Sequence, residues 1–267
     1  MIFPFSAQAL QASKEVNLSP IVDIGEGPET VVFLHGLFGT PDHWRIVMNG
    51  IADRYRVIAP QMPVDPAPGR RQRGIREISD LSEMVARMIE QKQLDSFVLC
   101  GNSLGGLVAL DLCISRPDFA KGLVLAGSAG LFERSPIRGL NSRPSREFIR
   151  STISGILYNH DLVTEELVDE WHGALTNRDY ARFVLRISRA TRDRSVEDEL
   201  ADLRVPTLII WGKNDEITPP STAYEFHRRI EGAKLEFIDN CGHAPSWEQP
   251  EEFARLLAGF LPQCFEE

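Results

Sequence analysis

The sequence predicts an α/β fold with a mostly parallel central sheet, helices flanking that sheet and an inserted helical cap. Two observations predict it: short apolar runs alternate with stretches of helical spacing, and one long interval contains no convincing buried strand. Strands that are buried on both faces give continuous apolar runs rather than alternating ones. Alternation of such strands with helices is typical of a sheet that is covered on both faces.

Six apolar runs are predicted as strands of this sheet: 31–34, 57–59, 97–100, 123–126, 208–211 and 235–238. Apolar residues at helical spacing predict helices at 44–51, 78–90, 104–113 and 253–260. A length of 267 residues is within reach of one large α/β domain. We therefore expect a single core made of residues 1–130 and 204–267.

The interval 131–203 departs from this alternation. It contains polar stretches of helical character at 145–156, 164–175 and 179–190. Thr164 precedes two glutamates and is a good helix start, because its hydroxyl can cap free amides and the carboxylates oppose the positive helix end. Pro206 marks the return to the core. We expect residues 131–203 to form a helical cap over one edge of the sheet.

Composition excludes several classes of partner. The 29 Lys and Arg against 38 Asp and Glu give a net charge of −9, which disfavours nucleic acid and anionic membrane surfaces. The four cysteines are far apart, with no C-x-x-C spacing, and predict thiols rather than disulfides. The start of the chain lacks a signal-peptide pattern, and no apolar run reaches about 18 residues. We expect a soluble cytoplasmic protein; the sequence carries no signal for an oligomeric state.

The strongest local motif is Gly101-Asn102-Ser103-Leu104-Gly105-Gly106. It directly follows the predicted strand 97–100 and directly precedes a predicted helix. A serine on such a sharp turn needs a strained backbone, and flanking glycines remove side chains that would clash there. The helix start offers free amides to a developing oxyanion. This context predicts Ser103 as a catalytic nucleophile.

A serine hydroxyl needs a nearby base, and His243 is the best candidate because it lies between a predicted strand and the last helix. An imidazole pKa near 6.5 suits proton transfer at neutral pH. The acid of such a triad lies between serine and histidine in the chain. Asp215 follows the strand 208–211 and fits this order, ahead of Glu216, Asp239 and Asp202. Its role would be to orient the imidazole and stabilise its cation.

The segment His35-Gly36-Leu37-Phe38-Gly39 follows the strand 31–34 and is predicted to complete an oxyanion hole. The expected donors are the backbone N–H groups of Leu37 and Leu104. Loss of one such donor typically costs roughly 3 kcal/mol of transition-state stabilisation. His35 itself is interpreted as structural. The chain has no phosphate-binding glycine loop with lysine, no H-E-x-x-H and no Cys/His cluster, so we expect neither a metal nor an organic cofactor.

Four motifs carry a resemblance to the α/β-hydrolase superfamily: residues 35–39, residues 101–106, Asp215 and His243. Their order and their places after predicted strands resemble that superfamily over nearly the whole chain. The resemblance implies an eight-stranded, mostly parallel sheet with the active site between core and lid. It does not fix the substrate, because one fold hosts many reactions. The serine argues against the epoxide hydrolases and haloalkane dehalogenases of this fold, which use an aspartate nucleophile.

Within the superfamily, the chain resembles the meta-cleavage-product hydrolases, which cut carbon–carbon bonds in dienoic diketo acids. The nucleophile turn 101–106 and the cap segment from Ile156 through 162–167 to Trp171 carry this resemblance. Two positions depart from it. Those enzymes have an arginine before the cap tryptophan, where this chain has Glu170, and a tryptophan after the catalytic histidine, where this chain has Ala244. Glutamate would repel a dienoate, although Arg186, Arg189 or Arg192 could take the place of that arginine.

These departures favour hydrolysis of carboxylic esters with small to medium acyl chains over carbon–carbon cleavage. The expected partner is therefore a small-molecule ester. A non-catalytic binding protein on the same fold is a further alternative, which the intact set of motifs disfavours. The expected pocket residues are Phe38, Asn102, Leu104, Phe132, Leu157 and Trp171.

Overall fold

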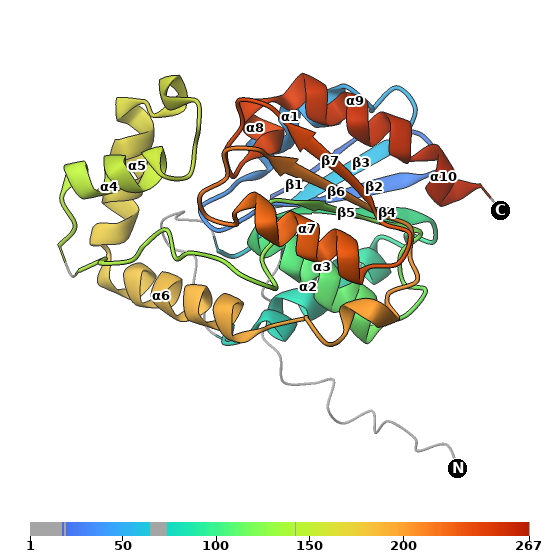
Figure 1. Ribbon diagram of the computed structural model, residues 1–267, viewed down its shortest axis with the longest axis horizontal. Helices are drawn as coiled ribbons and strands as arrows, with labels where there is room; N and C mark the ends of the chain where they lie inside the picture. The colour runs from blue at the N-terminus through green and yellow to red at the C-terminus, as the bar shows by residue number, and fades with distance from the viewer. Residues whose placement is uncertain (1–17, 19, 65–73, 142, 267) are drawn as a thin grey trace, which may run out of the picture.

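The computed structural model describes residues 18, 20–64, 74–141 and 143–266. A sheet runs through the centre of this part of the chain, with strands in the order β1-β3-β2-β4-β5-β6-β7 (Figure 1). The strands are β1 Ile21–Ile24, β2 Thr30–Leu34, β3 Arg56–Pro60, β4 Phe97–Asn102, β5 Gly122–Ala126, β6 Thr207–Gly212 and β7 Lys234–Ile238. Strands β2 to β7 run parallel, whereas β1 pairs antiparallel with β3.

All six predicted strands are present, which confirms the α/β class. The sheet has seven strands within the described residues rather than the eight that the resemblance implies. The seventh, β1, is an edge strand that we did not predict. Strand β4 lies in the middle, where Phe33 of β2 pairs with Cys100 and Asn102 pairs with Ala126 of β5. The carboxyl end of β4 is therefore flanked by the ends of β2 and β5.

Helices cover both faces of the sheet (Figure 1). On one face lie α1 Arg45–Asn49, α8 Pro245–Glu248, α9 Pro250–Phe260 and α10 Pro262–Phe265; on the other lie α2 Ile78–Gln91, α3 Leu104–Ser115 and α7 Pro220–Arg229. Each layer has its own apolar core. On the first face, Trp44 from the 3₁₀ turn Pro41–Trp44 packs edge-on against Phe253, with ring centroids 5.6 Å apart.

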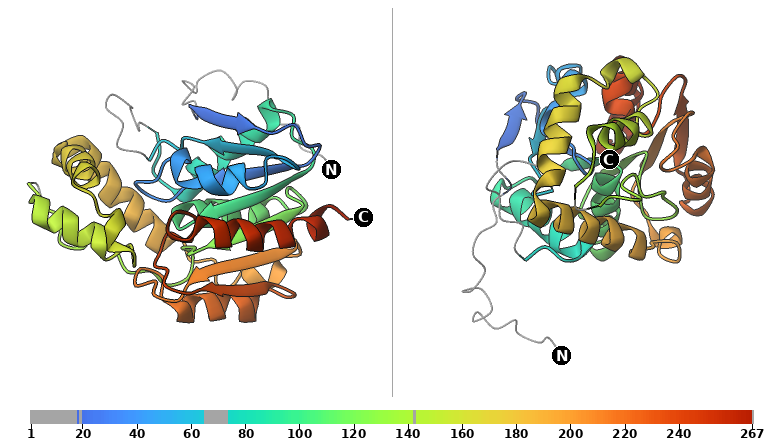
Figure 2. Two further views of the ribbon diagram at one scale, coloured as in Figure 1. Left: turned by 90° about the horizontal axis from the view of Figure 1, so that it is seen from above. Right: turned by 90° about the vertical axis from the view of Figure 1, so that its left-hand side faces the viewer.

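Three helices separate β5 from β6 in the chain: α4 Arg146–Ser154, α5 Glu165–Thr176 and α6 Arg178–Asp193. Short 3₁₀ turns occur at His160–Leu162 and Leu200–Asp202. Figure 2 shows these helices at one end of the molecule, opposite the C-terminus. The Thr164 hydroxyl accepts the Leu167 N–H at 3.2 Å, which confirms the predicted helix start. All three helices fall within the interval predicted to be the cap.

No helix in the described ranges is long and apolar enough to cross a bilayer. The four cysteines are buried and unpaired, as the predicted thiols would be.

Candidate active site

Ser103 lies on the turn between β4 and α3, with φ 54° and ψ −118°. This left-handed backbone is rare for a residue other than glycine and is costly unless its surroundings fix it. Two hydrogen bonds do so: the Ser103 N–H donates to the Ala126 carbonyl at 3.0 Å, and the Ala129 N–H donates to the Ser103 carbonyl at 3.2 Å. The turn is therefore anchored to the end of the neighbouring strand.

The glycines of the motif are required by close packing around this turn. A Cβ atom on Gly101 would lie 2.3 Å from the Gly105 carbonyl oxygen, and one on Gly105 would lie 2.1 Å from the Leu34 carbonyl oxygen. Both distances are far below van der Waals contact. The G-x-S-x-G pattern thus lets the start of α3 pack directly on β2 and β4, with Ser103 at the top.

His243 and Asp215 come together although 28 residues separate them. Nδ1 of His243 lies 2.9 Å from Oδ2 of Asp215, and both side chains are buried. The other carboxylate oxygen accepts the N–H groups of Ile217 and Thr218 at 2.8 and 2.9 Å. Oδ2 also accepts the Thr218 hydroxyl at 2.8 Å. Thr218, which the sequence reasoning missed, therefore helps to hold the carboxylate against the imidazole.

The rival acids lie elsewhere. Glu216 and Asp202 are exposed. Asp239 is on the surface, with its carboxylate 2.6 Å from the Lys213 ammonium. Of the four candidates weighed, Asp215 alone contacts His243 in the structure.

The electrostatic setting of His243 favours the protonated imidazole. Burial is the largest single influence and opposes that form, whereas the negative charge of Asp215 and its hydrogen bond favour it. The charges of Glu133 and Glu248 act in the same direction. The pKa of His243 is therefore raised above its ordinary value. Such an imidazole is a strong base, suited to take a proton from a hydroxyl group.

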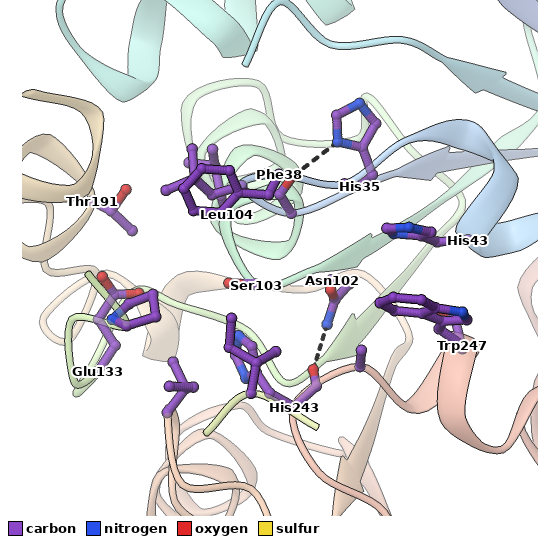
Figure 3. A pocket seen from close by; sticks show the side chains of 18 of the residues that line it. His35, Phe38, His43, Asn102, Ser103, Leu104, Glu133, Thr191, His243 and Trp247 are labelled. Carbon is purple, nitrogen blue, oxygen red and sulfur yellow. Dashed lines mark hydrogen bonds between the residues drawn. The ribbon is translucent and has the colours of Figure 1, made fainter. Parts of the chain in front are cut away.

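The histidine loop is tied to the nucleophile turn through Asn102. Its side-chain N–H groups donate to the Ala126 and His243 carbonyls, both at 2.9 Å (Figure 3). This places Asn102, a predicted pocket residue, at the base of the pocket as a bridge between two loops.

Glu248 joins the same histidine loop to the cap. Its Oε2 accepts the N–H groups of Tyr158 and Asn159 at 2.7 and 3.0 Å, and its Oε1 accepts those of Gly242 and Ala244 at 2.9 and 3.3 Å. Burial raises the pKa of this carboxyl, whereas the four amides oppose that shift. The sequence reasoning also missed this residue, which bonds two segments about 90 positions apart.

The predicted oxyanion loop lies beside the serine. Leu37, Phe38 and Leu104 all line the pocket with Ser103, and Leu104 is the first residue of α3. Phe38 has a positive φ of 62°, which gives the loop its tight bend. His35 accepts the Met62 N–H on Nε2 at 2.9 Å, and its Nδ1 lies 2.8 Å from the Gly36 carbonyl. These contacts agree with the structural interpretation of His35.

A pocket opens at Ser103, lined both by residues of the predicted core and by residues of the predicted cap (Figure 3). Of the predicted pocket residues, Phe38, Asn102, Leu104 and Trp171 line it. Two others do not. Phe132 is 54% exposed and lines a neighbouring surface groove instead. Leu157 is buried in the apolar core instead, and the preceding residue, Ile156, lines the pocket.

Charge is unevenly distributed in this pocket. Glu133 is its one acidic lining residue, and no lysine or arginine lines it in the part of the chain that the structure describes. His43 stacks on Trp247 with ring centroids 4.3 Å apart, and burial lowers its pKa to about 4, so it is neutral at pH 7. Glu170, the residue expected to repel a dienoate, is exposed and lies outside the pocket.

Among the described residues, no cluster of three or more His, Cys, Asp or Glu side chains is suited to hold a metal ion.

The comparisons with known proteins agree with this geometry. Residues 31–256 match the model of the alpha/beta hydrolase family. The chain belongs to this family. Because the match covers all four motifs, the hydrolase fold and a hydrolase activity are shown together.

Among curated relatives of this hydrolase is 2-hydroxy-6-oxo-2,4-heptadienoate hydrolase of Pseudomonas putida, 31% identical over 90% of this chain and 91% of that protein. Another is 2-hydroxy-6-oxo-6-phenylhexa-2,4-dienoate hydrolase of Comamonas testosteroni, 29% identical over 90% of each chain. A meta-cleavage product hydrolase from Pseudomonas fluorescens IP01 superposes with a TM-score of 0.79 at 25% identity, covering 91% of this chain and 93% of that one. These similarities confirm the predicted resemblance to the meta-cleavage-product hydrolases.

Proposed function

We propose that this protein hydrolyses the bond between a carbonyl carbon and its leaving group, with Ser103 as nucleophile, His243 as base and Asp215 as the orienting acid. The observation that carries the proposal is the 2.9 Å contact between His243 Nδ1 and Asp215 Oδ2, where His243 lines one pocket together with a serine on a strained strand-to-helix turn. A nucleophile, a base and an orienting group in one site are the arrangement that acyl transfer needs.

The reaction would begin when His243 takes the Ser103 proton as the hydroxyl attacks the carbonyl carbon. The Leu37 and Leu104 amides would hold the oxyanion, and Asp215 would stabilise the imidazolium. As the oxyanion collapses, the leaving group takes the proton from His243. Water, activated by His243, then attacks the acyl-serine and releases the acid.

The first substrate class to consider is a diketo acid whose carbon–carbon bond next to a ketone is cleaved. The curated relatives with 29–31% identity over nine-tenths of the chain support this class, since their names specify 2-hydroxy-6-oxo-dienoates. The exposed position of Glu170 removes one objection to it, because that carboxylate lies outside the pocket. The carbon leaving group would accept the proton that an alcohol accepts in ester hydrolysis.

A second candidate is hydrolysis of uncharged carboxylic esters. The composition of the pocket favours it: the described lining holds Glu133 and a neutral His43 but no lysine or arginine to receive a carboxylate. The three arginines considered as replacements, Arg186, Arg189 and Arg192, are all exposed. A dienoate would therefore bind without a direct cation in this pocket, whereas a neutral ester needs none.

The test is turnover of a p-nitrophenyl acyl series from acetate to dodecanoate, beside a phenyl-substituted dienoic diketo acid, by wild type and Ser103→Ala. The proposal predicts turnover of at least one class by wild type and a loss of at least about 10³-fold in the variant. Turnover confined to the diketo acid would identify a carbon–carbon hydrolase, and turnover confined to esters an esterase. Activity that survives in Ser103→Ala would contradict the proposal.

A further inference from the structure

The pocket has two chemically different ends on either side of Ser103 (Figure 3). At one end His43 stacks on Trp247, and both belong to the core. At the other end lie Glu133, in the segment that leads from β5 into the cap, and Thr191 of α6. His243 lies between them (Figure 3). The cap end therefore carries the acidic group of the pocket.

Glu133 is unusual among the carboxylates of the chain. Burial raises its pKa to about 7, although the charges of His243 and Arg192 oppose the shift. Within the described residues no group donates a hydrogen bond to its carboxyl. Arg192 is engaged elsewhere, since it donates to the Ser188 hydroxyl at 2.8 Å, and its side chain is exposed. Glu133 is partly buried, and its carboxyl has no hydrogen-bond partner among the described residues at the edge of the pocket.

A desolvated carboxyl without a partner costs free energy, and a bound ligand that supplies a donor removes that cost. A second carboxylate at the same place would be repelled, because like charges are poorly screened in a partly buried site. The positive charges that act on Glu133 are those of His243 and Arg192. His243 is already paired with Asp215 at 2.9 Å. Among the described residues no protein group is therefore placed to pair with Glu133, and a bound substrate can supply that partner.

We propose that Glu133 is a specificity-determining residue of the hydrolase, which binds substrates presenting a hydroxyl or ammonium group toward the cap and disfavours those presenting a carboxylate there. This inference rests on the proposed Ser103 chemistry and extends it to the selection of substrate. A role in folding is disfavoured, because a carboxyl without a protein partner stabilises no contact between elements.

The test uses phenylboronic acids, whose boron forms a reversible adduct with a catalytic serine and thus holds the ring in the pocket. The matched probes are 3-(aminomethyl)-, 3-(hydroxymethyl)-, 3-methyl- and 3-carboxyphenylboronic acid, with Kd measured by calorimetry at pH 8. We expect wild type to bind the aminomethyl probe at least about tenfold more tightly than the carboxy probe. Glu133→Gln should reduce that preference by about tenfold.

The control variant is Glu216→Gln, which removes the same charge from an exposed residue outside the pocket and should keep the wild-type preference. Wild type alone gives a second measurement: the preference should shrink between pH 8 and pH 6, as the carboxyl of Glu133 becomes protonated. A preference that is unchanged in Glu133→Gln would overturn the role of Glu133. Ser103→Ala binding all four probes as tightly as wild type would instead overturn the serine chemistry itself.

Discussion

The core side and the cap side of the pocket are built in different ways. On the core side, Ser103, Asp215 and His243 sit on turns whose backbones are fixed by hydrogen bonds to neighbouring strands and loops. On the cap side, Trp171 and Glu133 are placed by the packing of helices and by an irregular segment. Trp171 packs against Phe38 with ring centroids 4.1 Å apart. The residues of the proposed chemistry are thus fixed by backbone hydrogen bonds, whereas the proposed substrate selection would depend on side chains placed by packing.

This contrast suggests how one fold can keep its reaction machinery while its substrate changes. The four motifs of the core are backbone arrangements that tolerate little change. A charge at the cap end, such as Glu133, changes without disturbing them. Variants on the core side should therefore abolish activity, and variants on the cap side should redirect it.

The largest effect is expected for Asp215→Asn. The amide keeps the size of the side chain but favours the wrong imidazole tautomer, so kcat should fall by about 10⁴-fold. Steady-state kinetics on the best substrate measures this. Asp239→Asn is the matched control, because Asp239 pairs with Lys213 on the surface, and its kcat should stay within twofold of wild type. Equal losses in both variants would contradict the assignment.

Gly105→Ala tests the close packing beneath the nucleophile. Its new Cβ would lie 2.1 Å from the Leu34 carbonyl oxygen, so the free energy of unfolding should fall by about 3 kcal/mol. Urea denaturation measures the loss. Gly173→Ala in α5 is the control: nothing lies near its Cβ, and alanine should stabilise the helix by up to about 1 kcal/mol. A harmless Gly105→Ala would show that the turn is not closely packed.

Glu248→Gln tests the junction between the two sides. The amide group would face two of the four backbone N–H donors and leave them without acceptors, which should cost about 1–3 kcal/mol of unfolding free energy. Denaturant midpoints give the measurement, with the exposed Glu231→Gln as control. Because His243 lies in the loop that Glu248 holds, kcat should fall as well. An unaltered midpoint would mean that the junction is not stabilising.

The pH dependence gives the smallest of these effects. His243 must be neutral to act as a base, and its pKa is raised, so kcat/KM should fall about tenfold per pH unit below a midpoint that lies above pH 6.5. Asp215, Glu133 and Glu248 all raise that pKa by their charges. Glu133→Gln should therefore move the midpoint to lower pH. A midpoint that moves upward in this variant would contradict the electrostatic arrangement.

The core was predictable from the sequence because its strands are buried and its motifs lie next to them. Strand β1 was missed because it is only four residues long and includes the charged Asp23. The pocket walls were harder to predict. Ile156 and Leu157 are adjacent and both apolar, so the sequence does not show which of them lines the cavity. In the structure, α4 ends two residues before Ile156, which lines the cavity, whereas Leu157 is buried in the core.

The roles of Thr218, Glu133 and Glu248 were not predictable from local pattern. Those of Thr218 and Glu248 depend on contacts with residues that the fold brings in from elsewhere, such as the bonds from Tyr158 and Asn159 to Glu248. That of Glu133 depends on its place in the lining of the pocket. A sequence shows that a glutamate is present but not that its surroundings bury it.

The measurement that tests the central claim most directly is labelling with a serine-directed fluorophosphonate, followed by mass spectrometry of the intact and digested protein. The account predicts one adduct per chain, located on Ser103, with labelling slowed strongly in Asp215→Asn and absent in Ser103→Ala. No labelling of wild type, or an adduct on another serine, would contradict it and would favour a binding protein on this fold.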